Sequence, residues 1–273
     1  MCRMLGFASR VPRTTQEIVG PDNCAAFHTL SSLHSDGWGT AWIDEGSVRR
    51  YREPVGGASS RGLSGSLADT PSIARIAHLR LATVLGGNHI RNTHPFRVGD
   101  VALIHNGSIG PVAKLRSLVR ADELERVGGT TDTAAVFALI LRRIDSGATV
   151  FDAVTETVED LSIRFPGAAL NLFVLTPQEL IAVHAASAAP APKEALLARG
   201  FGRTLPPGHE DDYYNLSFLR TEDAVAFASS GIETEGWETV PPESAIRVDL
   251  HDLSLTTRAL ETVATAHELV RPA

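Results

Sequence analysis

The sequence predicts an α+β fold in which two mainly antiparallel sheets form a sandwich with helices on the outside. Short apolar runs bounded by Gly, Pro, Asn and Asp dominate the 273 residues, and runs of that length and punctuation are typical of strands. Helical periodicity is strongest in the middle of the chain, whereas strand-like runs occupy both ends. This segregation favours layered sheets and helices over a repeated strand–helix–strand unit.

Individual elements follow from the same patterns. The clearest helix covers residues 131–143, where apolar residues recur on one face behind Thr130, Thr131 or Asp132 as a cap. Residues 149–163 and 112–119 are predicted to form further helices. Residues 185–192, rich in Ala and Pro, are expected to form a loop within a single domain of residues 1–273, because strand-like runs resume after them. The predicted strands cover residues 4–8, 40–43, 73–82, 101–105, 170–175, 180–184, 224–228 and 245–250.

Composition and charge exclude several classes of protein. The 25 basic residues are outnumbered by 32 acidic ones, and the net charge of -7 provides no footprint for nucleic acid. No run of about 18 apolar residues and no signal-peptide core occurs, so we expect a cytoplasmic protein that does not bind a membrane. The histidines lack the spacing of known metal sites, and we expect neither a metal nor another cofactor.

Cys2 is the first candidate for chemistry. Loss of Met1 would leave a thiol and a free α-amine on this one residue. The α-amine titrates at about pH 8, so it can take the thiol proton and later return one to a departing amine. The structural alternative is a cysteine that merely begins a strand.

The apolar run 101–104 is followed by His105, Asn106 and Gly107. An amide side chain and a glycine N–H are therefore expected together at the end of a strand. Both groups can donate to an oxygen that becomes negative, as in an oxyanion hole. An Asn-Gly pair is also a common turn signal.

Arg80 and Asp132 carry opposite charges at the predicted ends of a strand and a helix. The planar guanidinium of Arg80 suits an α-carboxylate, and the carboxylate of Asp132 suits an α-ammonium. Together they can bind the two charged groups at the head of a free amino acid. The alternatives are a strand-end salt bridge for Arg80 and a helix cap for Asp132.

Two further segments are expected near the pocket or in its frame. Trp38, between Gly37 and Gly39, lies either close to the substrate or at the anchor of a turn. Residues 92–96 are expected to form a fixed loop beside the pocket, with a structural role for His94.

Together these segments resemble the class II glutamine amidotransferase family, because six short motifs occur in the family's order. The later segments 171–175 and 228–232 are similar to the back half of stand-alone members, so the resemblance extends over nearly the whole chain. The motifs are Cys2, Asp36-Gly37-Trp38-Gly39, His78-Leu79-Arg80-Leu81-Ala82-Thr83, Asn92-Thr93-His94-Pro95-Phe96, His105-Asn106-Gly107 and Thr131-Asp132-Thr133.

The resemblance implies the four-layer αββα sandwich of N-terminal-nucleophile hydrolases and a cysteine mechanism on an amide. Leu81 and Val84 depart from the larger synthases, in which an aromatic residue and a histidine often stand at these positions. The implied site residues are Cys2 as nucleophile with its α-amine as base, Asn106 and Gly107 as oxyanion hole, and Arg80, Thr83 and Asp132 as substrate-binding residues.

The expected activity is cleavage of the side-chain amide of glutamine or of a γ-glutamyl compound. In one version the chain releases ammonia to a separate synthetase, and in the other it cleaves a γ-glutamyl amide by itself. Arg80 and Asp132 do not distinguish these versions, because both substrates have the same amino-acid head. An alternative from another class is a catalytically idle regulatory or binding protein on the same fold.

Overall fold

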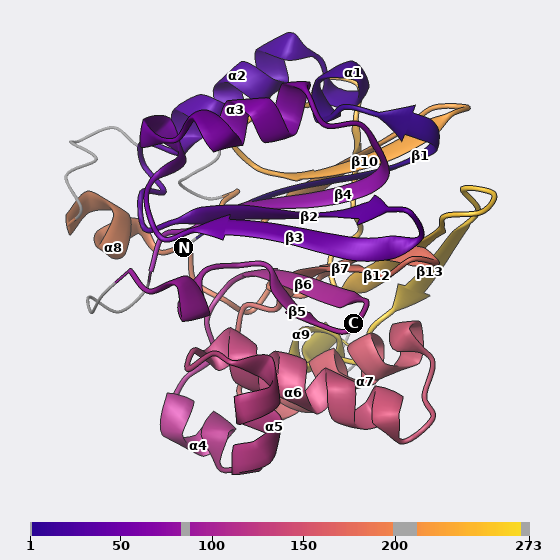
Figure 1. Cartoon of the computed structure of the whole chain (residues 1–273). Coiled ribbons are helices and arrows are strands. Elements are labelled where there is room, and N and C mark those ends of the chain that lie inside the picture. The colour runs from indigo at the N-terminus through magenta and orange to yellow at the C-terminus, as the bar shows by residue number, and fades with distance from the viewer. Residues whose placement is uncertain (1, 83–87, 199–211, 269–273) are drawn as a thin grey trace.

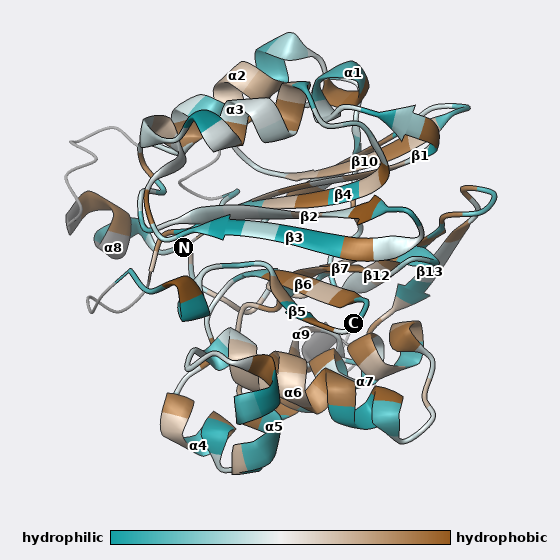
Figure 2. Ribbon diagram, viewed as in Figure 1, coloured by the Kyte–Doolittle hydropathy of each residue, from teal (hydrophilic) through white to brown (hydrophobic). Residues whose placement is uncertain are grey.

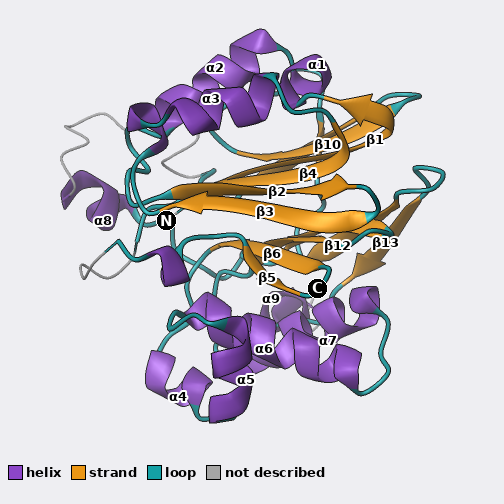
Figure 3. Cartoon of the chain, in the orientation of Figure 1, coloured by secondary structure: helices purple, strands orange, loops and turns teal. Residues whose placement is uncertain are grey.

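Two antiparallel sheets lie face to face, and helices cover the outer face of each (Figure 1 and Figure 3). The computed structural model describes residues 2–82, 88–198 and 212–268. Over these residues one sheet has the order β11 (Glu238–Thr239), β9 (Leu216–Arg220), β10 (Ala224–Ser229), β1 (Arg3–Arg13), β4 (Ser72–Leu79), β2 (Trp38–Asp44), β3 (Ser47–Glu53). The other has the order β13 (Leu255–Ala259), β12 (Ser244–Asp249), β8 (Glu179–His184), β7 (Asn171–Leu175), β6 (Val101–Asn106), β5 (Phe96–Val98).

The helices form the two outer layers, and the predicted four-layer αββα sandwich is confirmed. Over the sheet that contains β1 lie α1 (Thr15–Val19), α2 (Pro21–Leu30) and α3 (Arg61–Ala68) (Figure 1). Under the sheet that contains β6 lie α4 (Val112–Arg116), α5 (Ala121–Val127), α6 (Asp132–Asp145) and α7 (Val150–Arg164). The shorter α8 (Lys193–Ala198), α9 (Val263–Glu268) and the 3₁₀ turns η1 (Gly57–Ser59) and η2 (Ile90–Asn92) complete the described elements.

Strand β1 shows how side-chain alternation builds the layers. Met4 and Ala8 belong to the apolar core between the sheets, whereas Leu5 and Phe7 belong to the core under α1–α3. Because successive side chains of a strand point to opposite faces, Cys2 is in phase with the inner face and Arg3 with the outer one. The side chain of Cys2 is therefore on the side of β1 that faces the other sheet.

The predicted strands are found at their expected positions, but five strands at or next to sheet edges were missed, namely β3, β5, β9, β11 and β13. Much of β3 is hydrophilic (Figure 2) because it reads Ser-Val-Arg-Arg-Tyr-Arg-Glu at the edge of its sheet. Charged side chains on an edge strand prevent pairing with other molecules. They also replace the apolar residues by which a strand is recognised in a sequence. Strands β9 and β13 lie near or at sheet edges in the same way.

The prediction that helices gather in the middle of the chain is wrong, because α1–α3 lie within the first 70 residues. Helix α2 begins after Gly20 with Pro-Asp-Asn, and these residue types are ordinarily turn signals. Its buried side chains are few, namely Cys24, Phe27 and Leu30. Tertiary packing against the sheet stabilises this helix where the local pattern is weak.

The mid-chain helices agree with the sequence. Thr131 caps α6 by accepting a hydrogen bond from Ala134 N at 3.3 Å, and Thr149 caps α7 through Asp152 N at 3.1 Å. Helix α4 ends at Arg116, earlier than predicted. Residues 185–192 form the expected loop.

Trp38 begins β2 and does not line the pocket described below. Its side chain is fully buried in the core with Phe27 and Leu63, and its Nε1 donates to Glu53 Oε2 at 3.1 Å. In the described part of the chain no helix has the length and apolarity that crossing a bilayer would require.

Candidate active site

Cys2 lies just before β1, where the ends of β4 and β6 meet it. Its main-chain N donates to Asn106 Oδ1 at 3.0 Å, a contact between residues 104 positions apart. Its Sγ lies 3.9 Å from Leu81 O, and its own carbonyl oxygen accepts from Tyr213 Oη at 3.5 Å. The first residue of a processed chain would thus be held at its nitrogen, sulfur and carbonyl.

Asn106 ends β6 and is fully buried. Its Oδ1 holds Cys2, whereas its Nδ2 is buried and has no hydrogen-bond partner among the described residues. A buried donor without an acceptor costs about 1–3 kcal/mol. The arrangement leaves one N–H donor beside Cys2 for the oxygen of a ligand.

Gly107 can only be glycine at this position. A Cβ there would lie 2.0 Å from Ala169 O, which is backbone and cannot move aside. With no side chain in the way, the main chain of residue 107 lines the cavity next to Cys2.

Four of the predicted site residues line one cavity of about 550 Å³. Asn106 does not line it but accepts a hydrogen bond from Cys2 N. Asn92 and His94 also line it, so the 92–96 segment lies beside the pocket as predicted. The four residues are Cys2, Arg80, Gly107 and Asp132. Thr83 lies outside the described residues.

Arg80 follows β4 and is only 7% exposed. Its main chain pairs with the segment before β2, since Arg80 N donates to Gly37 O at 2.8 Å and Asp36 N donates to Arg80 O at 2.9 Å. Its Nη1 donates to Asp36 O at 3.2 Å, and Asp36 Oδ2 accepts from Ala82 N at 2.6 Å. The Asp36-Gly37 motif therefore positions the arginine, a role that the sequence did not reveal.

Asp132 opens α6 but is not its cap, because Thr131 has that role. Its Oδ2 accepts from Ile109 N at 3.0 Å and its Oδ1 accepts from Thr133 N at 2.9 Å. Each carboxylate oxygen has a second lone pair for another donor. The side chain is thus held in place and can still bind an ammonium group.

Three buried histidines form the wall behind these groups. His105 bonds Thr133 Oγ1 and Ala169 O, each at 2.9 Å, and its carbonyl contacts His78 Nε2 at 3.1 Å. The rings of His78 and His94 lie 4.2 Å apart. Burial lowers the pKa of His78 to about 3 and that of His94 well below its usual value. Neither of these two rings carries charge at neutral pH.

Metal ligands do not gather in the part of the chain that the structure describes, since no three His, Cys, Asp or Glu side chains lie together as a metal would require. The cavity is lined by one thiol, by main-chain groups and by the charged side chains of Arg80, Arg116 and Asp132, and the amide of Asn106 adjoins it.

Comparisons with known proteins show what the chain is similar to. Residues 1–189 match the family model described as class-II glutamine amidotransferases. The chain is 25% identical to the γ-glutamyl-hercynylcysteine sulfoxide hydrolase of Mycobacterium tuberculosis over 94% of this chain and 96% of that protein. It is 31% identical to the glutamine–fructose-6-phosphate aminotransferase of Caulobacter vibrioides over 59% of this chain, but the match spans only 25% of that enzyme.

Among solved structures, a glutamine aminotransferase class-II domain protein from Silicibacter pomeroyi is similar with a TM-score of 0.58 at 16% identity, covering 95% of this chain and 99% of that one. At that identity the likeness concerns the fold, which is the sandwich of the amidotransferase type.

Proposed function

This chain belongs to the class II glutamine amidotransferase family, and we propose that it hydrolyses the side-chain amide of glutamine or of a γ-glutamyl compound through a thioester on Cys2. Action on amide bonds is the activity that the family match and the γ-glutamyl hydrolase relative support. The nucleophile, the thioester and the substrate are our inference from the cavity.

The geometry of Asn106 carries the proposal. One atom of its amide holds Cys2 N at 3.0 Å and the other is a buried donor without a partner in the described residues. The same side chain therefore orients the nucleophile and offers an N–H to the oxygen that its attack makes negative. Gly107 lies next to it in the chain and lines the cavity without a side chain, so a ligand can approach its main chain closely.

In the proposed reaction the α-amine of processed Cys2 takes the thiol proton, and the sulfur attacks the carbonyl carbon of the amide. Asn106 Nδ2 and Gly107 N–H stabilise the oxyanion. When the C–N bond breaks, the α-ammonium returns the proton to the leaving nitrogen, so ammonia or an amine departs. Water then attacks the thioester, the α-amine accepts its proton, and glutamate is released as the thiol forms again.

The head of the substrate is assigned to the two opposite charges. Arg80 binds the α-carboxylate and Asp132 binds the α-ammonium, because both face the same cavity as Cys2. That Thr83 assists the carboxylate stays a prediction.

The leaving group distinguishes two versions of this function. The relative from Mycobacterium tuberculosis, which matches over nearly its full length, favours a γ-glutamyl substrate hydrolysed without a partner. The synthetase-coupled version is favoured by the relative from Caulobacter vibrioides, whose own length is about four times the matched region. Work in the cytoplasm, a single unit over residues 1–273 and a synthetase partner remain predictions.

The decisive test follows glutamate release from glutamine and from a panel of γ-glutamyl amides. We expect turnover of at least one substrate, and a loss of ~10⁴-fold or more in Cys2→Ala. Cys24→Ala is the matched control, because Cys24 lies on the buried face of α2 and burial raises the pKa of its thiol to about 11. N-terminal mass analysis establishes that Met1 is absent from the sample.

Full turnover by Cys2→Ala would refute the nucleophile. A folded wild type that binds glutamine but hydrolyses none of the panel would instead support the idle binding protein.

A further inference from the structure

Arg3, the residue after the nucleophile, is a fully buried arginine that the proposed reaction does not use. It begins β1 and has no exposed surface. Its Nη1 donates to Tyr213 O at 3.1 Å and to Ser230 Oγ at 3.0 Å. Its Cζ lies 3.9 Å from the centre of the Tyr213 ring, so the guanidinium stacks on the aromatic face.

Within the described residues the charge of Arg3 has no counter-ion. Its Nε and Nη2 are buried without a hydrogen-bond partner, and no carboxylate pairs with it in the described parts of the chain. Burial lowers the pKa of Arg3, while Tyr213 and Cys2 act to raise it. Since an arginine keeps its proton in proteins, a positive charge is retained in the interior at a cost. A cost of this kind is often associated with a functional site.

Tyr213 connects this charge to the nucleophile. Besides stacking on Arg3, its Oη donates to the carbonyl oxygen of Cys2 at 3.5 Å. The end of a chain frays unless it is tied down. Asn106 holds Cys2 at the nitrogen, and the Arg3–Tyr213 stack holds it at the carbonyl on the opposite side.

We propose that Arg3 is a positioning residue for Cys2: with Tyr213 it anchors the main chain of the nucleophile and places an unneutralised positive charge behind it. That charge disfavours protonation of the α-amine and favours negative charge on the sulfur, so both effects activate Cys2. The inference rests on the proposed role of Cys2 as nucleophile.

Other groups face Cys2 from each element around it. Arg80, His94, His105, Arg116 and Asp132 line the cavity with Cys2, and the ring of His78 lies 4.2 Å from that of His94. Tyr213 and Tyr214 lie beside Arg3. Burial lowers the pKa of His78 to about 3 and raises the pKa of both tyrosines, so these three groups are uncharged at neutral pH.

Substrate binding is expected to neutralise some of the charges near Cys2 and not others. In the proposed complex the substrate's α-carboxylate neutralises Arg80 and its α-ammonium neutralises Asp132. Arg3 is on the other face of β1, out of reach of that head group. Its charge therefore acts on Cys2 with or without substrate.

The test measures the rate of Cys2 alkylation by iodoacetamide against pH, with the Cys2 peptide quantified by mass spectrometry in protein that lacks Met1. We expect the midpoint of the profile to rise by about one pH unit in Arg3→Met and to stay at the wild-type value in Arg3→Lys, which keeps the charge. Cys24 serves as the internal reference in each sample. Alkylation needs no turnover, so this result stands or falls separately from the hydrolase assay.

Kinetics provide the second readout. In Arg3→Met the acid limb of kcat/KM should move to higher pH by the same amount, with KM nearly unchanged. Tyr213→Phe keeps the stack but loses the bond to the Cys2 carbonyl, so kcat should fall about fivefold with no displacement of the profile.

Equal alkylation midpoints in folded wild type and Arg3→Met would overturn the proposal. If Arg3→Met does not fold, Arg3→Lys and Tyr213→Phe decide the matter. A displaced midpoint in Arg3→Lys, or a wild-type kcat in Tyr213→Phe, would then overturn it.

Discussion

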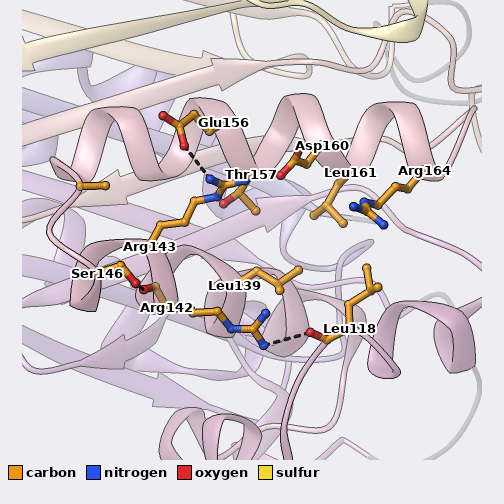
Figure 4. Close-up of a pocket in the computed structure, with 11 residues that line it drawn as sticks. Leu118, Leu139, Arg142, Arg143, Ser146, Glu156, Thr157, Asp160, Leu161 and Arg164 are labelled. Carbon is orange, nitrogen blue, oxygen red and sulfur yellow. Dashed lines mark hydrogen bonds and ion pairs between the residues drawn. The ribbon is translucent and has the colours of Figure 1, made fainter.

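Two cavities of similar size differ in what their charged residues do. The first is the Cys2 cavity of about 550 Å³, and the second, of about 500 Å³, lies between α6 and α7 in the outer layer (Figure 4). In the second cavity Arg143 bonds Glu156 at 2.6 Å and also pairs with Asp160. Arg142 bonds Leu118 O at 2.9 Å and pairs with Glu123.

In the Cys2 cavity the charges are held but not neutralised. Among the described residues neither Arg80 nor Asp132 forms an ion pair, and each is fixed by main-chain groups. Asn106 Nδ2 has no partner at all in the same residues. Charges that are paired within the protein are already stabilised by their partners, whereas unpaired charges can still be stabilised by a ligand. The pairing of the polar groups, and not the volume, distinguishes the proposed active site from the α6–α7 cavity.

The largest difference between the cavities should appear on removal of the unpartnered donor. We expect Asn106→Ala to lower kcat for glutamate release by ~100 to ~1000-fold with a smaller change in KM, since the oxyanion loses one donor. Asn23→Ala is the control, because Asn23 bonds the main chain of Val19 and Glu233 far from Cys2. An Asn106→Ala enzyme with wild-type kcat would remove the basis for the oxyanion hole.

The next largest effect is expected for Arg80, the proposed binding residue for the substrate's α-carboxylate. Arg80→Lys keeps the charge but loses the planar fork, and we expect KM to rise ~10 to ~100-fold in steady-state kinetics. The same change at the exposed Arg10 should have no effect. An unchanged KM in Arg80→Lys would mean that another group binds the head of the substrate.

The paired charges of the second cavity should instead affect stability, and in a pH-dependent way. Hydrogen bonding to Arg142 lowers the pKa of Glu123 from 4.5 to about 2. A carboxylate with a depressed pKa stabilises the fold above its unfolded value, and this contribution is lost as pH falls from about 4.5 toward 2. Because Arg142 is 36% exposed, solvent screens the pair and we expect roughly 1 kcal/mol.

Urea unfolding of wild type and Arg142→Gln at pH 6 and pH 3 measures this contribution. The two proteins should differ at pH 6 and approach each other at pH 3. A difference that grows at low pH would contradict the sign.

The smallest effect is expected for Arg143→Ala. Its partners Glu156 and Asp160 are about half exposed, so the free energy of unfolding should change by less than ~1 kcal/mol and glutamate release should not change. Thermal unfolding and the hydrolase assay measure the two quantities. A marked loss of activity would show that the α6–α7 cavity contributes to the site, and the contrast between the cavities would fail.

The accuracy of the sequence predictions followed the burial of each element. Helix α6 was recognised because its many apolar side chains recur on the buried face behind a Thr131 cap. Strand β3 was missed because its arginines face solvent or the loop at Thr93 and Pro95. Local patterns record burial, so elements that are half exposed or begin with turn residues are poorly marked.

For the site, the order of short motifs was enough to single out Cys2, Arg80, Gly107 and Asp132, which now line one cavity. The motif that contains Asp36 did not indicate a role for it, and no sequence pattern pointed to Arg3 or Tyr213. Their parts depend on contacts between residues as far as 211 positions apart, such as Tyr213 Oη with Cys2 O. No pattern along the chain records such a contact.

The sequence by itself determined which chemical groups exist and the type of most buried elements, because side-chain identity and apolar periodicity are local properties. Only the tertiary structure decided that Asn106 holds Cys2 with one amide atom, and that neither its other amide atom nor the buried charge of Arg3 has a partner or counter-ion in the part of the chain that the structure describes. Pairing of β1 with β4 and packing of the two sheets set these distances. Hydrogen bonds and charges act over a few ångströms, and the fold alone determines which distant residues come that close.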